Sequence, residues 1–263
     1  MIRVGNQSAF SAYPLTQPFE FALHHGFDAF EWFPDKHSDG SGWIPADLSP
    51  RQRQELRSRA RDAGISLTVH APIHVDPLRT ATHRDFEESL RLAVDLGAGL
   101  LNIHLIDPLR LEEFAQAVLP WIQRCSIAGV KLTVENLPAI APEDINRLFT
   151  LIPRHGLGFC FDLGHANLHP TTRNDYITFI DRLAQGVPIQ HLHLHENYGD
   201  EDSHLVLFSG PAGQNDQGIV ALWKRLQQRH FSGTAILEQW PSPPERLTQA
   251  RDQFLDLIRR STA

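Results

Sequence analysis

Lys131-Leu132-Thr133-Val134-Glu135 is the stretch that decides the fold, because a short, partly β-branched apolar run ends there in a carboxylate. The same arrangement recurs five times, and each run ends in a residue able to bind a metal. The other runs are residues 67–69 before His70, 100–103 before His104, 159–161 before Asp162, 190–192 before His193 and 235–237 before Glu238. Because the carboxyl ends of parallel strands gather on one face, these six side chains are expected to converge.

Helices are expected between the runs. Ser49 followed by Pro50 is typical of a helix start, and Gly64 of a helix end. The expected strands are 2–5, 29–33, 66–69, 100–104, 131–135, 157–162, 189–194 and 234–237. The expected helices are 18–25, 50–63, 82–96, 111–128, 142–151, 174–184, 216–229 and 243–260. Eight alternating units predict an α/β fold, a single (β/α)8 TIM barrel over residues 1–263 with its active site at the C-terminal face of the strands, in preference to an open doubly wound sheet.

Composition narrows the class of protein. The chain has 263 residues, 41% of them hydrophobic, which is enough for one large core. Two cysteines predict no disulfide framework. No signal peptide or long apolar segment is evident, so we expect a cytoplasmic protein without a membrane partner. A formal net charge of −7 argues against binding dominated by nonspecific contacts with nucleic acid.

The carboxylates are the first candidate site residues. Glu135 and Glu238 follow buried runs, where a charge is costly unless it is paired or bound to metal. An ion pair at the barrel rim is the alternative. Asp162 and His165 place two ligand types three residues apart, with Gly164 allowing a tight turn between them. Their alternative is a capping aspartate and a histidine bonded to the backbone.

Histidines supply the remaining candidates. His191, His193 and His195 alternate and therefore share one face of a strand. Of the three, His193 matches the level of the other ligands, His191 fits a hydrogen-bonded core residue, and His195 fits a contact to a ligand residue or to substrate. Asp202 and His204 could reach one cation from a loop, or belong to a solvated loop. His70 and His104 could be core residues singly, but consecutive strands place them as a pair of ligands.

Other residues in the loops that follow the strands carry weaker signals. Lys36, Arg79, Arg110 and Arg173 could bind a substrate anion, although solvated surface charges are the simpler interpretation. Trp32, Phe33 and Trp43 could line a pocket or pack in the core. Cys160 is expected in the core, and the turn at residues 210–213 could admit a ligand or be an ordinary turn. The sequence contains no Gly-rich phosphate motif.

The ordered motifs resemble a known family. Val-His-Ala-Pro at 69–72, Asn-Ile-His at 102–104, Val-Glu-Asn at 134–136, Asp-Leu-Gly-His at 162–165, His-Leu-His at 191–193, Asp-Ser-His at 202–204 and Leu-Glu-Gln at 237–239 resemble the xylose isomerase-like TIM barrel superfamily (AP endonuclease family 2). The motifs are similar above all to the branch containing endonuclease IV, and sugar phosphate isomerases and epimerases are further relatives.

The resemblance implies a metal site of up to three zinc ions. His70, His104 and Glu135 would hold the first, and Glu135 would bridge to a second that is also held by Asp162, His193 and Glu238. His165, Asp202 and His204 would hold the third. In the simpler isomerases, Glu135, Asp162, His193 and Glu238 would hold one Mn, Mg or Co ion, with His165 contacting substrate.

Two functions follow. The first is a multi-metal phosphoester hydrolase, in which a metal-bridging hydroxide attacks a phosphorylated small molecule or a nucleic-acid-derived substrate. The second is a sugar or sugar-phosphate isomerase or epimerase, in which Glu135 and Glu238 move a proton. The loop after His70 lacks the apolar wedge expected for penetrating DNA, so a small-molecule substrate is favoured. A noncatalytic metal-site barrel is the third class.

Overall fold

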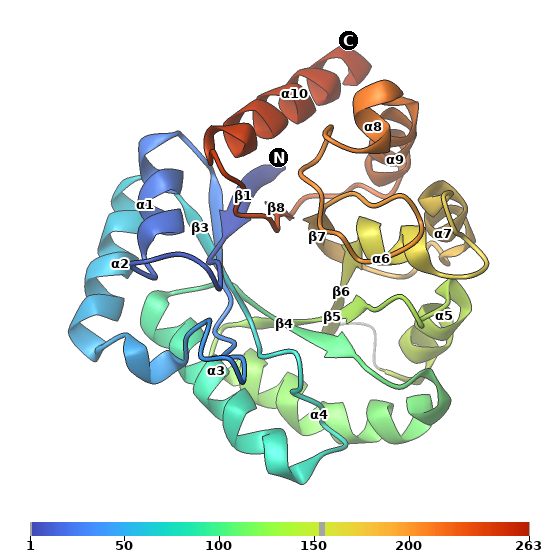
Figure 1. Cartoon of the computed structure of the whole chain (residues 1–263). Coiled ribbons are helices and arrows are strands. Elements are labelled where there is room, and N and C mark those ends of the chain that lie inside the picture. The colour runs from blue at the N-terminus through green and yellow to red at the C-terminus, as the bar shows by residue number, and fades with distance from the viewer. Residues whose placement is uncertain (1, 153–155, 263) are drawn as a thin grey trace.

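The computed structural model describes residues 2–152 and 156–262, in which eight parallel strands close into one barrel (Figure 1). Each strand pairs with the next, and β8 closes the barrel against β1. The strands are β1 (Arg3–Gln7), β2 (Ala29–Trp32), β3 (Ser66–His70), β4 (Leu100–Leu105), β5 (Lys131–Asn136), β6 (Leu157–Asp162), β7 (Ile189–Leu194) and β8 (Thr234–Leu237). The predicted (β/α)8 barrel is confirmed.

Helices surround the barrel on its outside (Figure 1). The α-helices are α1 (Gln17–His24), α2 (Pro50–Asp62), α3 (His83–Leu96), α4 (Leu111–Ile127), α5 (Pro142–Leu151), α6 (Leu163–Leu168), α7 (Tyr176–Arg182), α8 (Pro211–Gln214), α9 (Gln217–Gln228) and α10 (Glu245–Thr262). Short 3-10 turns occupy Pro45–Asp47, Thr80–Thr82 and Pro108–Arg110. The short helices α6 and α8 were not predicted from the sequence, because neither is long enough to show an apolar period.

Local sequence signals explain where several helices begin and end. Ser49 accepts a hydrogen bond from the backbone N–H of Gln52, which satisfies a donor at the start of α2. Gly97 ends α3 with a φ of 70°, a left-handed conformation that favours glycine. Asp162 ends β6 and also accepts from the backbone N–H of His165. The capping alternative for Asp162 is therefore present, and the second carboxylate oxygen, Oδ2, lies 3.2 Å from His195 Nε2.

The barrel register brings the candidate ligands to one level. His104 on β4 lies beside Glu135 on β5, and Asp162 on β6 lies beside His193 on β7. The apolar core lies between the barrel and its helices, for example where Phe86 stacks on Trp121 with ring centroids 3.9 Å apart. The strand ends therefore direct polar groups into the barrel interior. Apolar packing between the strands and the helices stabilises the outside of the barrel.

None of the helices within residues 2–152 and 156–262 is both long and apolar enough to cross a membrane.

Candidate metal centre

Glu135 is the residue on which the candidate ligands converge. Its Oε2 lies 3.2 Å from His70 Nε2 and 3.0 Å from His193 Nδ1. Its Oε1 lies 3.5 Å from His104 Nε2 and 3.4 Å from His165 Nδ1. All five side chains are almost completely buried. One carboxylate thus faces four imidazoles from β3, β4, the start of α6 and β7, as expected for a residue shared between cations.

A second group forms around His193. Its Nδ1 lies 3.1 Å from Glu238 Oε1 and 3.9 Å from Asp162 Oδ2. Glu238 directly follows β8, and Asp162 ends β6. Ligand atoms of Asp162, His193 and Glu238 all lie within 4.8 Å of one another, as do those of His70, His104 and Glu135. The two groups contain residues that the resemblance assigns to the first and second metal positions.

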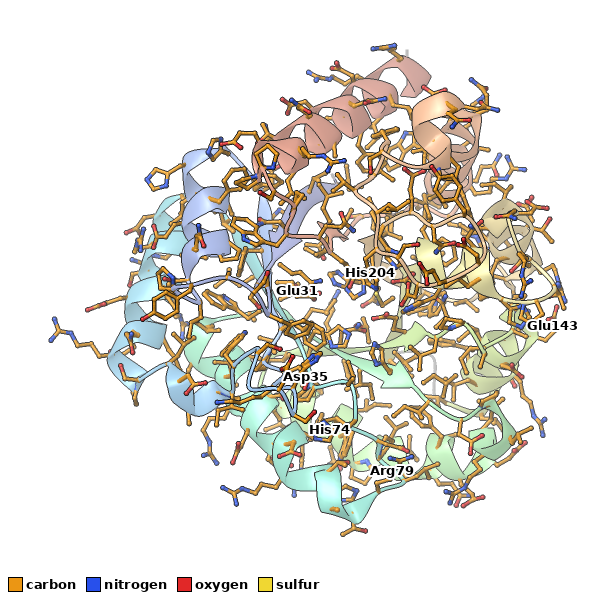
Figure 2. The ribbon with its side chains drawn as sticks, in the orientation of Figure 1. Glu31, Asp35, His74, Arg79, Glu143 and His204 are labelled. Carbon is orange, nitrogen blue, oxygen red and sulfur yellow. The ribbon has the colours of Figure 1, made fainter. Side chains whose placement is uncertain are left out.

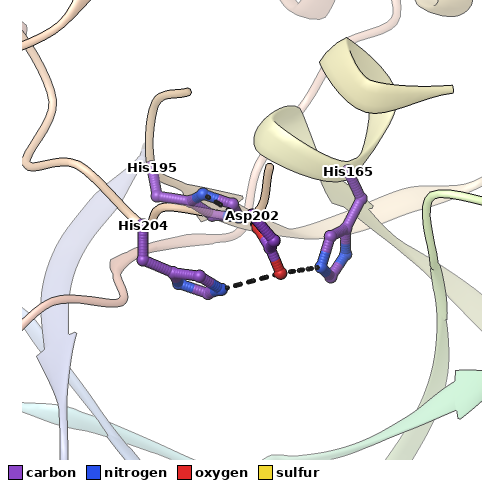
Figure 3. Close-up of side chains that lie close together, drawn as sticks. All are labelled: His165, His195, Asp202 and His204. Carbon is purple, nitrogen blue, oxygen red and sulfur yellow. Dashed lines mark hydrogen bonds and ion pairs between the residues drawn. The ribbon is translucent and has the colours of Figure 1, made fainter. Parts of the chain in front are cut away.

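The third group lies nearer the mouth of the barrel. Asp202 Oδ2 lies 3.2 Å from Nε2 of both His165 and His204 (Figure 3). The side chains of Asp202 and His204 are 39% and 38% exposed, whereas His165 is buried. The loop after β7 therefore folds back over the barrel and brings Asp202 and His204 to α6. Both side chains are partly solvated, as the solvated-loop alternative expects, and both also face another candidate ligand, His165 or Glu238.

Glu31 on β2 is a site residue that sequence reasoning missed. It is fully buried, and its carboxylate accepts from Nε2 of His191 and of His193, both at 2.9 Å. Thr68 donates a third hydrogen bond at 2.9 Å. Figure 2 shows Glu31 near the centre of the barrel, in contrast to Glu143 at its periphery. The signal was available, because Glu31 interrupts the apolar run Ala29-Phe30-Glu31-Trp32 in the way that Glu135 ends its own.

Hydrogen bonds to the backbone and to Glu31 fix which nitrogen each histidine offers. His70 Nδ1 contacts the carbonyl of Ala71, and His165 Nδ1 lies 2.9 Å from the carbonyl of Asn136. Both rings therefore direct Nε2 toward the carboxylates. His193 is oriented in the opposite sense, because Glu31 binds its Nε2 and leaves Nδ1 toward Glu135 and Glu238. Such outer hydrogen bonds commonly orient metal-binding imidazoles.

The two central glutamates have pKa values shifted in opposite directions. Burial raises the pKa of Glu135, but His193 and His104 outweigh burial and hold it well below its usual range. Burial and nearby Asp162 raise the pKa of Glu238 above its usual value. For Asp162, burial is again opposed by His165 and His195, and its pKa falls to about 2. Strongly perturbed, interacting carboxyl groups of this kind mark functional sites.

The donor set fits divalent metal ions. His193 Nδ1 and Glu238 Oε2 are buried and form no hydrogen bond with any residue in the described ranges, although oppositely charged groups surround them. An unsatisfied buried polar atom is costly, and a cation among these atoms would satisfy both. Nitrogen and carboxylate oxygen together suit zinc, manganese, iron or cobalt.

The structure also places the residues that carried weaker signals in the sequence. His191 is a hydrogen-bonded core residue, joined to Thr234 and Glu31. Trp32 and Trp43 pack edge to face in the core, and burial raises the pKa of Cys160 well above its usual value. At the turn formed by residues 210–213, the backbone N–H groups of Gly210 and Ala212 donate to the carboxylate of Glu196.

A cavity of about 980 Å³ opens above the three groups. Ligand residues from all of them line its floor, and apolar side chains form much of its wall, including Phe10, Phe33, Ile106, Leu137 and Trp240. Arg79 and Arg246 also line it, whereas Lys36, Arg110 and Arg173 are absent from its described lining. Figure 2 shows Arg79 on the loop that follows β3. The volume suits a small organic substrate rather than an ion alone.

Comparisons with known proteins agree with this architecture. MJ1311 of Methanocaldococcus jannaschii is 24% identical over 247 residues, which cover 85% of this chain and 78% of that protein. The structure of an L-ribulose 3-epimerase matches with a TM-score of 0.76 and 16% identity, covering 100% of this chain and 96% of that one. Endonuclease IV from Thermus thermophilus matches with a TM-score of 0.70 and 22% identity, covering 98% of this chain and 99% of that one.

These structural likenesses show a shared fold, and the fold carries both hydrolytic and epimerising enzymes. The family match is more extensive, because residues 19–258 fit the family described as "Xylose isomerase-like TIM barrel". From α1 to α10, the chain therefore belongs to the xylose isomerase-like TIM barrel family.

Proposed function

We propose that the protein is a multi-metal phosphoester hydrolase that acts on a small phosphorylated molecule. The observation that carries this proposal is the assembly of nine candidate ligands into three adjoining groups. A one-metal isomerase would use Glu135, Asp162, His193 and Glu238, and would have little need for His70 and His104 beside them. These two histidines are buried and face Glu135, which supports a role as ligands.

The residues have distinct tasks in this proposal. When bound, divalent ions would supply Lewis acidity for phosphoryl oxygens and make water nucleophilic at neutral pH. Glu135 would hold the first and second positions at a fixed separation, and Glu31 would orient His193. The apolar cavity wall would exclude bulk water, which strengthens electrostatic interactions in the site.

Two arginines are suited to bind the substrate anion. Arg79 lies 3.5 Å from Asp76 with 62% of its side chain exposed, and Arg246 forms no ion pair within the described ranges. Both line the cavity, so a phosphate at the floor could be reached from its walls. An extended polynucleotide is less well matched, because the net charge is −7 and apolar groups form much of the wall.

The test combines metal content with one ligand variant. Elemental analysis of the wild-type protein should give two to three ions per chain. His104→Gln should remove one ion and lower phosphoester hydrolysis by about 100-fold or more, beyond the loss typical of an outer hydrogen bond. His83→Gln on α3, outside the cavity lining, is the matched control. The hydrolase proposal would be contradicted if the wild-type protein held one loosely bound ion and the H104Q protein stayed active.

A sugar or sugar-phosphate epimerase is the second candidate, supported by the opposite pKa shifts of Glu135 and Glu238 on either side of His193 Nδ1. A low-pKa base facing a high-pKa acid is the pattern needed for moving a proton between two faces of a carbon. Incubation with ketoses and ketose phosphates in deuterated water should then label the substrate carbon, and Glu238→Gln should abolish labelling. Unchanged labelling by E238Q would remove this candidate.

A further inference from the structure

His195 occupies a position between the second and third groups of ligands. Its side chain is fully buried, its Nε2 lies 3.1 Å from Asp162 Oδ1, and its Nδ1 lies 3.8 Å from Asp202 Oδ1. Nδ1 forms no hydrogen bond with any residue that the structure describes. Figure 3 shows the ring beside Asp202, with His165 and His204 on either side of that carboxylate. A buried, unpartnered nitrogen is thus directed toward a cluster of ligands.

The hydrogen bonding of His195 has the same form as that of His193. In His193, Nε2 binds the carboxylate of Glu31 and Nδ1 is left facing the ligands. In His195, Nε2 binds the carboxylate of Asp162 and Nδ1 is likewise left without a hydrogen bond to the described residues. Metal-binding imidazoles typically donate their other N–H to a carboxylate or carbonyl, which sets the tautomer and leaves the second nitrogen as the ligand.

The lack of a side chain at Gly164 leaves room for the His195 ring. A Cβ atom added at Gly164 would lie 1.9 Å from His195 Cε1 and 2.3 Å from its Nδ1, distances that no side chain could occupy. Gly164 is therefore required where α6 passes the ring. The glycine between Asp162 and His165 has a packing role toward His195 in addition to any role in the turn.

We propose that His195 Nδ1 is a fourth protein ligand at the third metal position, together with His165, Asp202 and His204. Ligand atoms of these four residues lie within 4.8 Å of one another. Four protein ligands complete a tetrahedral zinc site and leave no open position, as in structural sites. The third ion would then link the loop after β7 to α6. Coordination positions open to water or substrate would remain only at the first and second metal ions. The inference rests on the multi-metal centre proposed above.

One ring has to turn for all four ligands to bind one ion. His195 and His204 stack at 3.9 Å with an interplanar angle of 4°, and parallel rings cannot both direct an in-plane lone pair at one point. His195 is held by Asp162 and Gly164, whereas His204 is 38% exposed and lies on the loop. His204 is therefore the ring that turns.

The decisive variant is His195→Gln, because the glutamine amide can still donate to Asp162 but has no nitrogen at the place of Nδ1. We expect its affinity for one zinc ion, measured by chelator competition, to fall by more than about 100-fold, which exceeds the loss for an outer hydrogen bond. Gly164→Ala should have the same effect by displacing the ring. His24→Gln on the exposed face of α1 is the control. An H195Q protein whose zinc affinity equals that of wild type would overturn the inference.

A measurement on the wild-type protein avoids any effect of a variant on folding. Nitrogen-15 NMR of histidine-labelled, zinc-loaded protein should show two histidines bound through Nδ1, namely His193 and His195. A single such histidine would overturn the proposal. Failure of the hydrolase is distinguishable: if wild type holds one ion that H195Q loses and H104Q keeps, the His195 inference stands and the hydrolase falls.

Discussion

Glu31 and His193 are joined by a hydrogen bond of 2.9 Å between Oε1 and Nε2, and this bond leaves Nδ1 of His193 3.0 Å from Glu135. The carboxylate lies on β2 and the imidazole on β7, so the bond spans the barrel interior. Burial raises the pKa of Glu31, but His191 and His193 outweigh burial and hold it well below its usual range. Glu31 is therefore charged and suited to accept from both rings.

Replacing Glu31 by glutamine should weaken binding of the second metal ion by about 10–100-fold, the usual effect of losing an outer hydrogen bond to a ligand. The amide offers only one acceptor atom for two imidazoles, so His193 loses its fixed tautomer. Zinc competition with a chromophoric chelator measures the change. Glu55→Gln, an exposed glutamate paired with Arg51 on α2, is the matched control. Equal affinities for E31Q and wild type would show that His193 is oriented by other contacts.

The metal-free protein should lose stability as the pH rises from about 6.5 to about 9. Burial alone lowers the pKa of His204, but its hydrogen bond to Asp202 prevails and raises the pKa to about 9. The unfolded value is about 6.5. A raised folded pKa stabilises fully below the unfolded value, and the contribution disappears as pH passes the folded value. Urea unfolding of chelator-treated protein at several pH values measures this, and His204→Gln should flatten the dependence. An unchanged slope in H204Q would assign the dependence to other groups.

Removing the metal ions should lower the thermal unfolding temperature, and restoring zinc should raise it in proportion to the logarithm of the free zinc concentration. Ions that bind only the folded chain stabilise it by about 2.7 kcal/mol at a concentration 100 times their dissociation constant. The orphaned atoms His193 Nδ1 and Glu238 Oε2 are the physical source, because they regain partners. Calorimetry with and without chelator is the measurement. Magnesium, which prefers six oxygen ligands, is the comparison ion and should restore less.

Phe86→Ala should destabilise the fold by about 3–5 kcal/mol, the range for truncating a buried phenylalanine. Phe86 is fully buried on α3 and stacks on Trp121 of α4 at 3.9 Å and 7°. Ile127→Ala on α4 is the control, because that side chain is 80% exposed. Urea unfolding compares the two, and metal content should stay at the wild-type level in both. Similar losses for F86A and I127A would mean that the helices contribute little packing energy.

The sequence predicted the barrel and the gathering of polar side chains at its strand ends because both depend on short local patterns. An apolar run before Glu135 or His104 marks a strand end, and parallel strands bring their ends together without further information. The strand-end pattern did not indicate Glu31, because this residue lies within β2 and not after it. The orientations of His165 and His193 could not be predicted, since they depend on acceptors distant in sequence, namely Asn136 and Glu31. The placement of Asp202 likewise depends on how a loop folds back.

The candidate ligands are spread over many strands, so the proposed metal centre is complete only when these strands have assembled. In the proposed centre, the first position would draw on β3, β4 and β5, and the second on β5, β6, β7 and the residue after β8, with Glu135 common to both. No contiguous fragment that stops before β8 contains Glu238, and β8 itself is secured by pairing with β7 and β1. In the proposed centre, the second position would therefore be complete only when β8 is in place, and a proteolytic cut that frees β8 should lower the affinity for that ion.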